Sequence, residues 1–322
     1  MTLKETAMDT TTITCPTHTF RAMGCQIDLW LETDEATAVS AFAAVVQLFA
    51  ENERLLSRFL PTSELSQLNG RAGQWVPVSD LLWNVLEEAL IWALATDGLF
   101  DPTCLNALEA AGYTASFEAL AAAQHNGRSA ATHLLTGQWS AIRLDVDRQA
   151  VYLPPGVRID LGGIAKGYTA QQAVNLMSRW GACLVNAGGD LVAGPAPAGF
   201  PGWPVGIARP SATKRTNTAL NIWLVDAALA TSGVDYRRWT MNGRAAHHLI
   251  DPRTGQPAAT NLLTATVWAA QAAEAEVRAT TSLIMGLHES LDFLESQPHL
   301  AAVLFSADGE MHQTPTIHNL AF

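Results

Sequence analysis

The run RIDLGGIAKGY at residues 158–168 places a pair of glycines between an apolar stretch and a lysine. We predict a β-strand that ends at Asp160, a turn at the glycines, and a helix that carries Lys166. Glycines let backbone N–H groups approach an anion, and a helix N-terminus and a lysine add positive charge, so the run is typical of a phosphate-binding turn. Its order does not fit a Walker A loop or the GxGxxG dinucleotide fingerprint. The alternative is a glycine pair that serves only the packing of strand and helix.

A second dense segment is HLIDPRTG at residues 248–255. It combines an imidazole, a carboxylate, a guanidinium and a hydroxyl around a turn fixed by proline, a density that is typical of a functional site. The alternative is an ordinary turn in which Asp251 caps backbone amides and Arg253 faces solvent.

Two further segments carry oxygen or aromatic groups that chemistry could use. Glu276 and Thr280 stand four residues apart on a predicted helix. Their oxygens therefore lie on one face and could bind one hard cation, such as a magnesium ion already held by phosphates. The alternative is a pair of ordinary exposed polar residues at helical spacing. A loop at residues 99–103 offers an aromatic ring and a carboxylate, and by itself it indicates only a turn.

Hydrophobic periodicity and capping residues predict the elements that position these groups. We expect strands at 26–31, 183–187, 203–207 and 263–269, a hairpin over 142–153, and helices at 34–56, 79–94, 168–180, 272–285 and 289–294. The helix at 79–94 should bury one broad face that includes Leu94, and Gly98 should end it. A second glycine pair follows the strand at 183–187, so two such turns can share one cleft.

Composition limits the function classes. The chain has 322 residues, 48% of them hydrophobic, and a formal net charge of −11. This balance argues against a nucleic-acid partner or an anionic membrane, because both need clustered lysine and arginine. The four cysteines are far apart, which argues against a zinc site or a disulfide framework. The N-terminal segment lacks the apolar region of a secretory signal and no stretch is long enough to span a membrane, so we expect a cytoplasmic protein without membrane insertion.

Taken in order, these segments resemble the ApbE-like family of FAD:protein FMN transferases, over residues 20 to about 286. The resemblance is carried by MG at 23–24, SELSQLN at 63–69, GLFDPT at 98–103, DLGGIAKG at 160–167, NAGGD at 186–190, ATSG at 230–233 and HLIDPRTG at 248–255. It implies an α/β (α+β) fold, T-fold-like, with one catalytic unit over 19–322 in which mixed sheets are flanked by helices. The polar, threonine-rich residues 1–18 are expected to form a flexible tail.

The resemblance also implies an activity. FAD would be the substrate, Mg²⁺ the cofactor, and an acceptor flavoprotein the partner, whose threonine or serine hydroxyl receives FMN while AMP is released. The FAD site would be lined by Met23, Phe59, Leu99, Phe100, Asp101, Asp160, Lys166 and His248. The metal would be held by the Gly163 carbonyl, the Glu276 carboxylate and Thr280. His248 and Glu276 are the implied catalytic residues, and the proton acceptor is either His248 or a carboxylate near the metal.

Three positions depart from the family pattern. Glu276 stands where the family usually has aspartate, Phe59 where tyrosine is common, and Cys25 where threonine often follows Met-Gly. The longer glutamate shifts a carboxylate within a magnesium shell of demanding geometry. Two alternatives therefore stay open beside the transferase: an FAD pyrophosphatase that yields FMN and AMP, and a non-catalytic FAD-binding protein.

Overall fold

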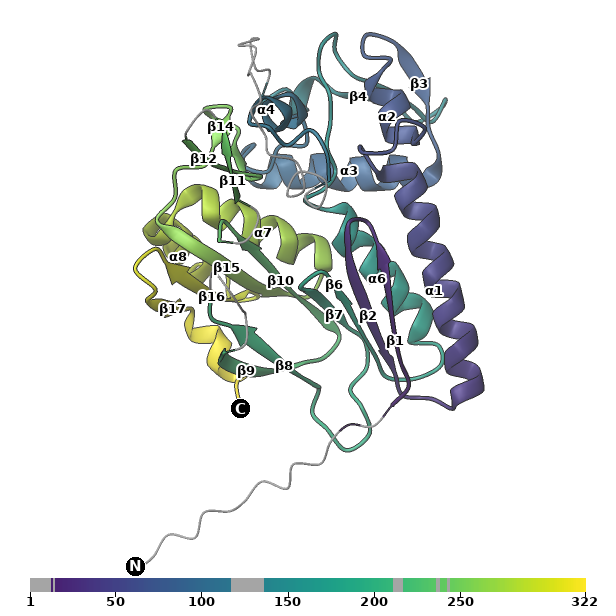
Figure 1. Ribbon diagram of the computed structural model, residues 1–322, viewed down its shortest axis with the longest axis vertical. Coiled ribbons are helices and arrows are strands. Elements are labelled where there is room, and N and C mark those ends of the chain that lie inside the picture. Colours follow the sequence, from purple (N-terminus) through teal and green to yellow (C-terminus); the bar gives the residue numbers. More distant parts are fainter. Residues whose placement is uncertain (1–12, 14, 117–135, 211–216, 236–237, 242–243) are drawn as a thin grey trace, which may run out of the picture.

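An eight-stranded sheet forms the centre of the molecule, in the order β1-β2-β6-β7-β10-β15-β16-β17 (Figure 1). The computed structural model describes residues 13, 15–116, 136–210, 217–235, 238–241 and 244–322. Every strand pairing among these residues is antiparallel. The α/β (α+β) class is confirmed, but the expectation of mixed sheets is wrong, because hairpins such as β1-β2, β6-β7 and β16-β17 build the sheet and parallel crossovers do not.

The helices are α1 (Glu35–Leu56), α2 (Glu64–Asn69), α3 (Asp80–Ala95), α4 (Leu105–Ala110), α6 (Ala165–Met177), α7 (Ala272–Met285) and α8 (Leu287–Glu295), with 3₁₀ turns η1 (Trp139–Ala141) and η2 (Pro315–Asn319). The strands of the large sheet are β1 (Thr17–Ala22), β2 (Cys25–Leu31), β6 (Cys183–Ala187), β7 (Asp190–Ala193), β10 (Ala227–Gly233), β15 (Leu262–Ala269), β16 (Ala301–Ser306) and β17 (Met311–Gln313). Four small sheets are formed by β3 (Trp75–Pro77) with β4 (Arg143–Asp145) and β5 (Ala150–Tyr152), by β8 (Trp203–Ala208) with β9 (Thr218–Leu224), by β11 (Arg238–Met241) with β12 (Arg244–His247), and by β13 (Ile250–Asp251) with β14 (Gln256–Pro257).

Four hydrophobic clusters are found among the described residues, and the three large ones hold the layers together. The main core joins one face of the large sheet to α1, α6 and α7, and a second joins the sheet to the β8-β9 hairpin and η2. A third core lies beside the sheet, between α2, α3 and the β3-β5-β4 sheet, and it also receives side chains from α7. Helices α6 and α7 pack against each other, and each contributes side chains to both the main core and the third core.

Local signals account for most element boundaries. Asp34 and Ser79 cap α1 and α3 with their side-chain oxygens. Helix α7 spans 272–285 as expected, and the hairpin over 142–153 is present as β4-β5. Helix α6 begins at Ala165 and carries Lys166, as predicted, but it ends at Met177, short of the expected end at Trp180.

Three expectations are wrong. Residues 158–161 form no strand, because Ile159 pairs with the side chain of Asn69 instead of with a neighbouring strand: Asn69 Nδ2 donates to the Ile159 carbonyl at 2.9 Å, and the Ile159 N–H donates to Asn69 Oδ1 at 2.8 Å. Leu94 is 71% exposed, since it lies on the outer side of α3. Strand β1 begins at Thr17, so the end of the expected tail belongs to the sheet.

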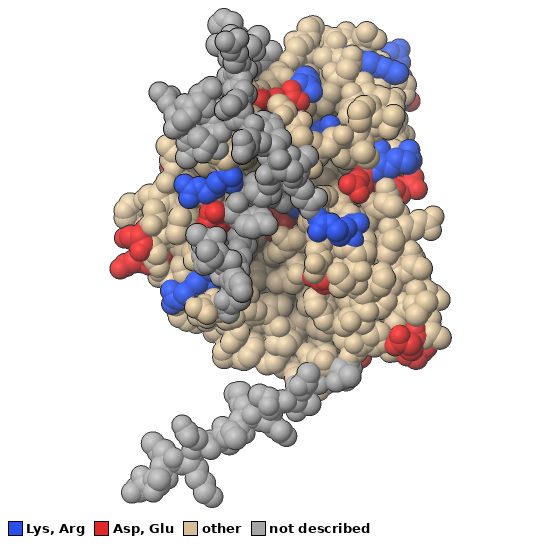
Figure 2. All heavy atoms as spheres, in the orientation of Figure 1, with Lys and Arg blue, Asp and Glu red and all other residues tan. Residues whose placement is uncertain are grey.

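Residues 1–12 and 14 of that tail lie outside the described part of the chain, and their expected flexibility stays a prediction. No helix in the described ranges has the length and apolar character that crossing a membrane requires. On the face drawn in Figure 2, basic and acidic side chains of the described residues are interspersed.

Candidate active site

A pocket of about 400 Å³ lies beside helices α6 and α7. It is lined by every residue that the sequence analysis nominated: Met23, Phe59, Leu99, Phe100, Asp101, Asp160, Gly163, Lys166, His248, Glu276 and Thr280. Both glycine pairs contribute to the lining, through Gly162 and Gly163 and through Gly188. The fold therefore brings these segments to one place, and the two glycine-pair turns share one cleft, as expected. The role of each residue stays a prediction.

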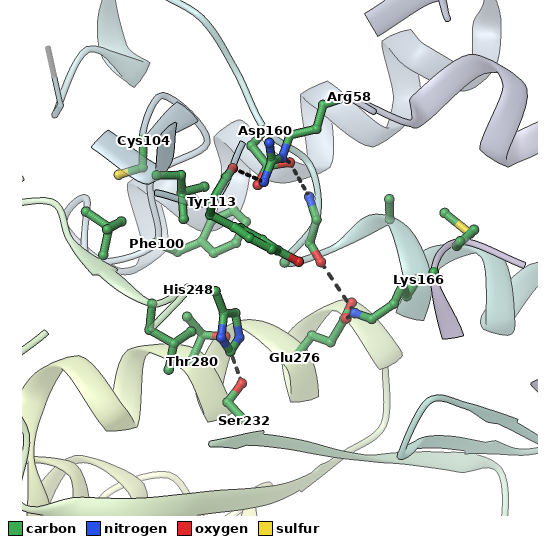
Figure 3. Close-up of a pocket in the computed structure, with 18 of the residues that line it drawn as sticks. Arg58, Phe100, Cys104, Tyr113, Asp160, Lys166, Ser232, His248, Glu276 and Thr280 are labelled. Carbon is green, nitrogen blue, oxygen red and sulfur yellow. Dashed lines mark hydrogen bonds and ion pairs between the residues drawn. The ribbon is translucent and has the colours of Figure 1, made fainter. Parts of the chain in front are cut away.

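The charged end of the pocket is organised by Lys166, the second residue of α6. Its Nζ lies 2.5 Å from Glu276 Oε1 and 3.5 Å from Asp190 Oδ2, and it donates to the Gly162 carbonyl at 3.4 Å. All three charged side chains are largely buried, with at most 16% of each side chain exposed. One ammonium thus lies between two carboxylates from different elements, and Figure 3 shows it beside Glu276.

Glu276 also completes the N-terminus of α6, which has no side-chain cap of its own. The Gly167 N–H donates to Glu276 Oε2 at 3.0 Å, so the carboxylate occupies the positive end of the helix. A Cβ at residue 167 would lie 2.7 Å from that oxygen. The glycine is therefore required for the approach of Glu276, and this part of the predicted phosphate-binding turn binds a carboxylate of the protein itself.

Opposing effects act on the Glu276 carboxyl. Burial raises its pKa above the ordinary value, Lys166 opposes that rise, and the negative charge of Asp190 adds to it. The net direction is upward. Asp190 is fixed independently, because the Thr231 N–H of β10 donates to its Oδ1 at 3.1 Å.

Thr280 lies one turn after Glu276 on α7, as the helical spacing predicts. Its hydroxyl is 2.9 Å from the Ser232 hydroxyl at the end of β10. His248 lies beside this pair in Figure 3, and the Tyr113 ring is 6.4 Å from its ring in an edge-on arrangement. A metal-ligand candidate and a proton-acceptor candidate thus border the same part of the pocket.

Asp160 faces the pocket from the segment that Asn69 holds. Its Oδ1 accepts from the Gly162 N–H at 3.2 Å and lies 3.4 Å from Nε of Arg58. Asp160 thus lines the pocket, although the strand expected to carry it is absent.

Asp101 and Phe100 support the pocket wall. Asp101 accepts hydrogen bonds from the Thr103 N–H, the Thr103 hydroxyl and the Gly137 N–H, so its carboxylate is used to order a loop. Phe100 is 6% exposed and belongs to the third core. The turn that the sequence analysis predicted at residues 99–103 is therefore present.

The tips of two hairpins border the pocket. Met23 and Gly24 turn β1 into β2 with φ angles of 51° and 71°, values that are typical of a type I′ turn and unusual for methionine. Gly188 and Gly189 join β6 to β7 in the same manner, and the Gly188 N–H donates to the Gln26 carbonyl at 3.0 Å.

The segment 248–255 divides between pocket and turn. Asp251 accepts from the Arg253 backbone and forms a two-pronged pair with its guanidinium at 2.9 Å. Burial alone would raise the Asp251 pKa, but the hydrogen bonds from Arg253 outweigh it and lower that pKa. Arg253 is half exposed, so these two residues form the ordinary turn, while His248 lines the pocket.

Among the pocket residues that the sequence analysis did not nominate, three are charged or aromatic groups that the site uses: Arg58, Tyr113 and Asp190. Asp190 follows the second glycine pair, and that position was a usable signal. Arg58 follows the last turn of a long helix, where a basic residue is common for electrostatic reasons. Tyr113 follows a short helix, and nothing near it in sequence indicated a site.

The chain is similar in sequence to known proteins over most of its length. A sequence model of the ApbE family matches residues 23–304. A Treponema pallidum protein named FAD:protein FMN transferase is 27% identical over 303 residues, which covers 88% of this chain and 82% of that protein. A Klebsiella pneumoniae protein of the same name is 29% identical over 298 residues, or 87% of this chain and 81% of that protein.

Solved structures show the same fold. The ApbE protein from Thermotoga maritima superposes with a TM-score of 0.81 at 24% identity, covering 96% of this chain and 100% of the other. The apo form of the flavinyl transferase ApbE from Pseudomonas stutzeri gives a TM-score of 0.79 at 20% identity, covering 97% and 98% of the two chains.

Proposed function

Since this chain belongs to the ApbE family, we propose that it transfers FMN from FAD to a hydroxyl of an acceptor protein, the activity for which its curated relatives are named. The observation that carries the proposal is the pairing, in one pocket, of aromatic rings at Phe59 and Tyr113 with a charged end at Lys166, Glu276 and Asp190. FAD likewise joins planar rings to a pyrophosphate. A pocket of about 400 Å³ is within the range of small-ligand sites.

The proposed reaction is a substitution at phosphorus. The acceptor hydroxyl oxygen forms a bond to the phosphorus next to riboflavin, the bond to the bridging oxygen of the pyrophosphate breaks, and AMP leaves with that oxygen. The hydroxyl proton goes to a base. We propose His248 for this role, because it borders the charged end from the side opposite Lys166 (Figure 3).

Lys166 would bind a pyrophosphate oxygen. Its ammonium is already anchored by two carboxylates, so it is oriented before the substrate arrives. Glu276 and Asp190 together outweigh its single charge, and a further cation would balance them.

The donor set fits a magnesium ion. The oxygens around Lys166 come from two carboxylates and a backbone carbonyl, and Thr280 adds a hydroxyl one turn along α7. Among the described residues there is no cluster of three His, Cys, Asp or Glu side chains that could hold a metal, but Mg²⁺ commonly takes one or two carboxylates and completes its shell with phosphates and water. We propose Glu276, Thr280 and the Gly163 carbonyl as its protein ligands; when bound, it would neutralise charge on the pyrophosphate.

The test is mass spectrometry of an acceptor domain incubated with this protein, FAD and Mg²⁺, with AMP assayed in parallel and EDTA as the control. The acceptor should carry an Asp-x-x-Ser/Thr-Gly-Ala-Thr-like segment, with a variant lacking the last threonine hydroxyl beside it. A mass gain equal to FMN that EDTA prevents would support the transferase. AMP without a mass gain would favour the FAD pyrophosphatase, and bound FAD with neither product would favour a non-catalytic flavin-binding protein.

A further inference from the structure

Arg58 occupies an unusual position for a charged residue. Its side chain is only 5% exposed, and it lies on the pocket wall where the chain leaves α1. Nε lies 3.4 Å from Asp160 Oδ1, and Nη2 donates to the Tyr113 carbonyl at 3.1 Å. One guanidinium therefore connects three segments that are far apart in the sequence, and Figure 3 shows them together along one side of the pocket.

The same guanidinium contacts the faces of two aromatic rings. Its central carbon lies 4.0 Å from the ring centroid of Phe59 and 4.7 Å from that of Tyr113, distances at which cation–π attraction is substantial. The two rings meet edge to face with centroids 5.8 Å apart. Tyr113 in turn stacks on Trp239 at 5.5 Å and 21°, so the rings and the cation form one connected wall.

The charges of this wall are balanced. An arginine stays ionised in a protein, and burying it is costly unless a partner offsets the charge. Asp160 provides that partner. The guanidinium meets a carboxylate, a backbone carbonyl and two ring faces at once, which favours a role in holding these neighbours.

Those neighbours are suited to a planar ring. Phe59 is 39% exposed although its ring lines a pocket, and an open aromatic face favours stacking. The carboxylate of Asp160 has lone pairs beyond those used by Gly162 and Arg58, so it can accept a hydrogen bond from a ring N–H.

We propose that Arg58 is a positioning residue for ring recognition: it holds the Phe59 and Tyr113 rings and the Asp160 carboxylate in the arrangement that binds a planar ring of FAD. The proposal rests on the proposed function, because it names how the same pocket recognises its substrate. It separates a ring-binding side, organised by Arg58, from the phosphate-binding side at Lys166.

The test replaces Arg58 by methionine, which keeps an unbranched apolar stem and removes every donor. Arg58→Met should weaken FAD binding about tenfold, the size expected from losing a charge-assisted contact, and should raise KM with a smaller change in kcat. Binding of inorganic pyrophosphate with Mg²⁺ should stay within twofold of the wild type. Fluorescence quenching of bound FAD, which reports ring stacking, should decrease, and Arg58→Lys should restore part of the affinity because it keeps the charge facing Asp160.

Arg278 offers a matched control. It is also a partly buried arginine between two aromatic rings, Trp92 at 5.3 Å and Phe293 at 4.7 Å, and it does not line the pocket. Arg278→Met should lower Tm as much as Arg58→Met does, and it should leave the FAD affinity unchanged. Binding should be measured on fully folded protein, and Arg58→Lys decides the question if Arg58→Met does not fold.

Equal FAD affinity in the Arg58 and Arg278 variants would overturn the proposal, as would an equal loss of FAD and pyrophosphate binding in Arg58→Met. The wild type is measured first. A wild type that neither binds FAD nor transfers FMN overturns the proposed function itself, whereas a functional wild type matched by Arg58→Met overturns only the role of Arg58.

Discussion

Lys166 on α6 and Glu276 on α7 form an ion pair with Nζ and Oε1 2.5 Å apart, and the same carboxylate accepts the Gly167 N–H at 3.0 Å. The contact joins two helices that both line the pocket, α6 through its first turn and α7 through Glu276 and Thr280. Both helices also pack against the sheet in the main core, so the position of this ion pair depends on how that core is packed.

Glu276→Ala should abolish Mg²⁺-dependent AMP release, because it removes a buried carboxylate from the proposed metal site. It should also lower the free energy of unfolding by about 2 kcal/mol, less than for a fully orphaned charge because Asp190 still faces Lys166. Glu276→Gln keeps an acceptor for Gly167 and should be more stable than the alanine variant but equally inactive. Turnover titrated with Mg²⁺ and urea unfolding are the measurements, and undiminished turnover in Glu276→Ala would refute the assignment.

Gly167→Ala should destabilise the protein by about 1 to 3 kcal/mol, since the new Cβ would lie 2.7 Å from Glu276 Oε2 within a packed interior. Displacement of the Glu276 carboxylate should also weaken Mg²⁺ binding, so turnover should need a higher Mg²⁺ concentration. Gly70→Ala is the control, because its Cβ would meet only backbone oxygens at 3.5 Å and 3.6 Å, which is ordinary contact. Thermal unfolding of both variants tests the difference; similar Tm values would show that the close approach of Glu276 does not depend on glycine.

Asn69→Ala should cost about 3 kcal/mol of stability, because it removes two hydrogen bonds and leaves the buried Ile159 backbone without them. The loosened segment carries Asp160, so FAD affinity should fall as well. Asn106 makes a comparable bond to the Gly156 carbonyl at an exposed position, and Asn106→Ala should change stability by no more than about 0.5 kcal/mol. Denaturant titration measures the stability of both variants, and a binding titration measures their FAD affinity. The prediction is wrong if Asn69→Ala and Asn106→Ala give the same values.

The stability of the protein should fall as pH decreases below about 6.5, in part through His247. Burial lowers the pKa of His247, and nearby Arg238 adds to this, although the bond to the Ala258 carbonyl opposes it. The unfolded chain therefore binds a proton that the folded protein does not, and this contribution is complete above the unfolded pKa and lost as pH falls through the folded one. His247→Asn should flatten the dependence of unfolding free energy on pH between 7 and 5; an unchanged slope would exclude His247 as a contributor.

The candidate site could be predicted from sequence to the extent that its residues sit in local motifs. Lys166, Glu276, Thr280 and His248 each belong to a segment whose residue types suggested chemistry, and the fold places all of them on one pocket. Arg58 could not be found in this way, because its meaning depends on Asp160 and Tyr113, which no local pattern connects to it.

The sequence alone determined the bounds of the long helices α1, α3 and α7 to within a residue or so and the hairpin over 142–153, since side-chain caps such as Asp34 and the hydrophobic period of α7 act within a few residues. Tertiary structure decided the rest. It put the Asn69 side chain where a strand was expected at residue 159, and it turned Leu94 toward solvent. It also surrounded Lys166 with carboxylates from α7 and β7. These outcomes depend on which buried groups find partners across the folded chain, and that competition has no signature within a short window of sequence.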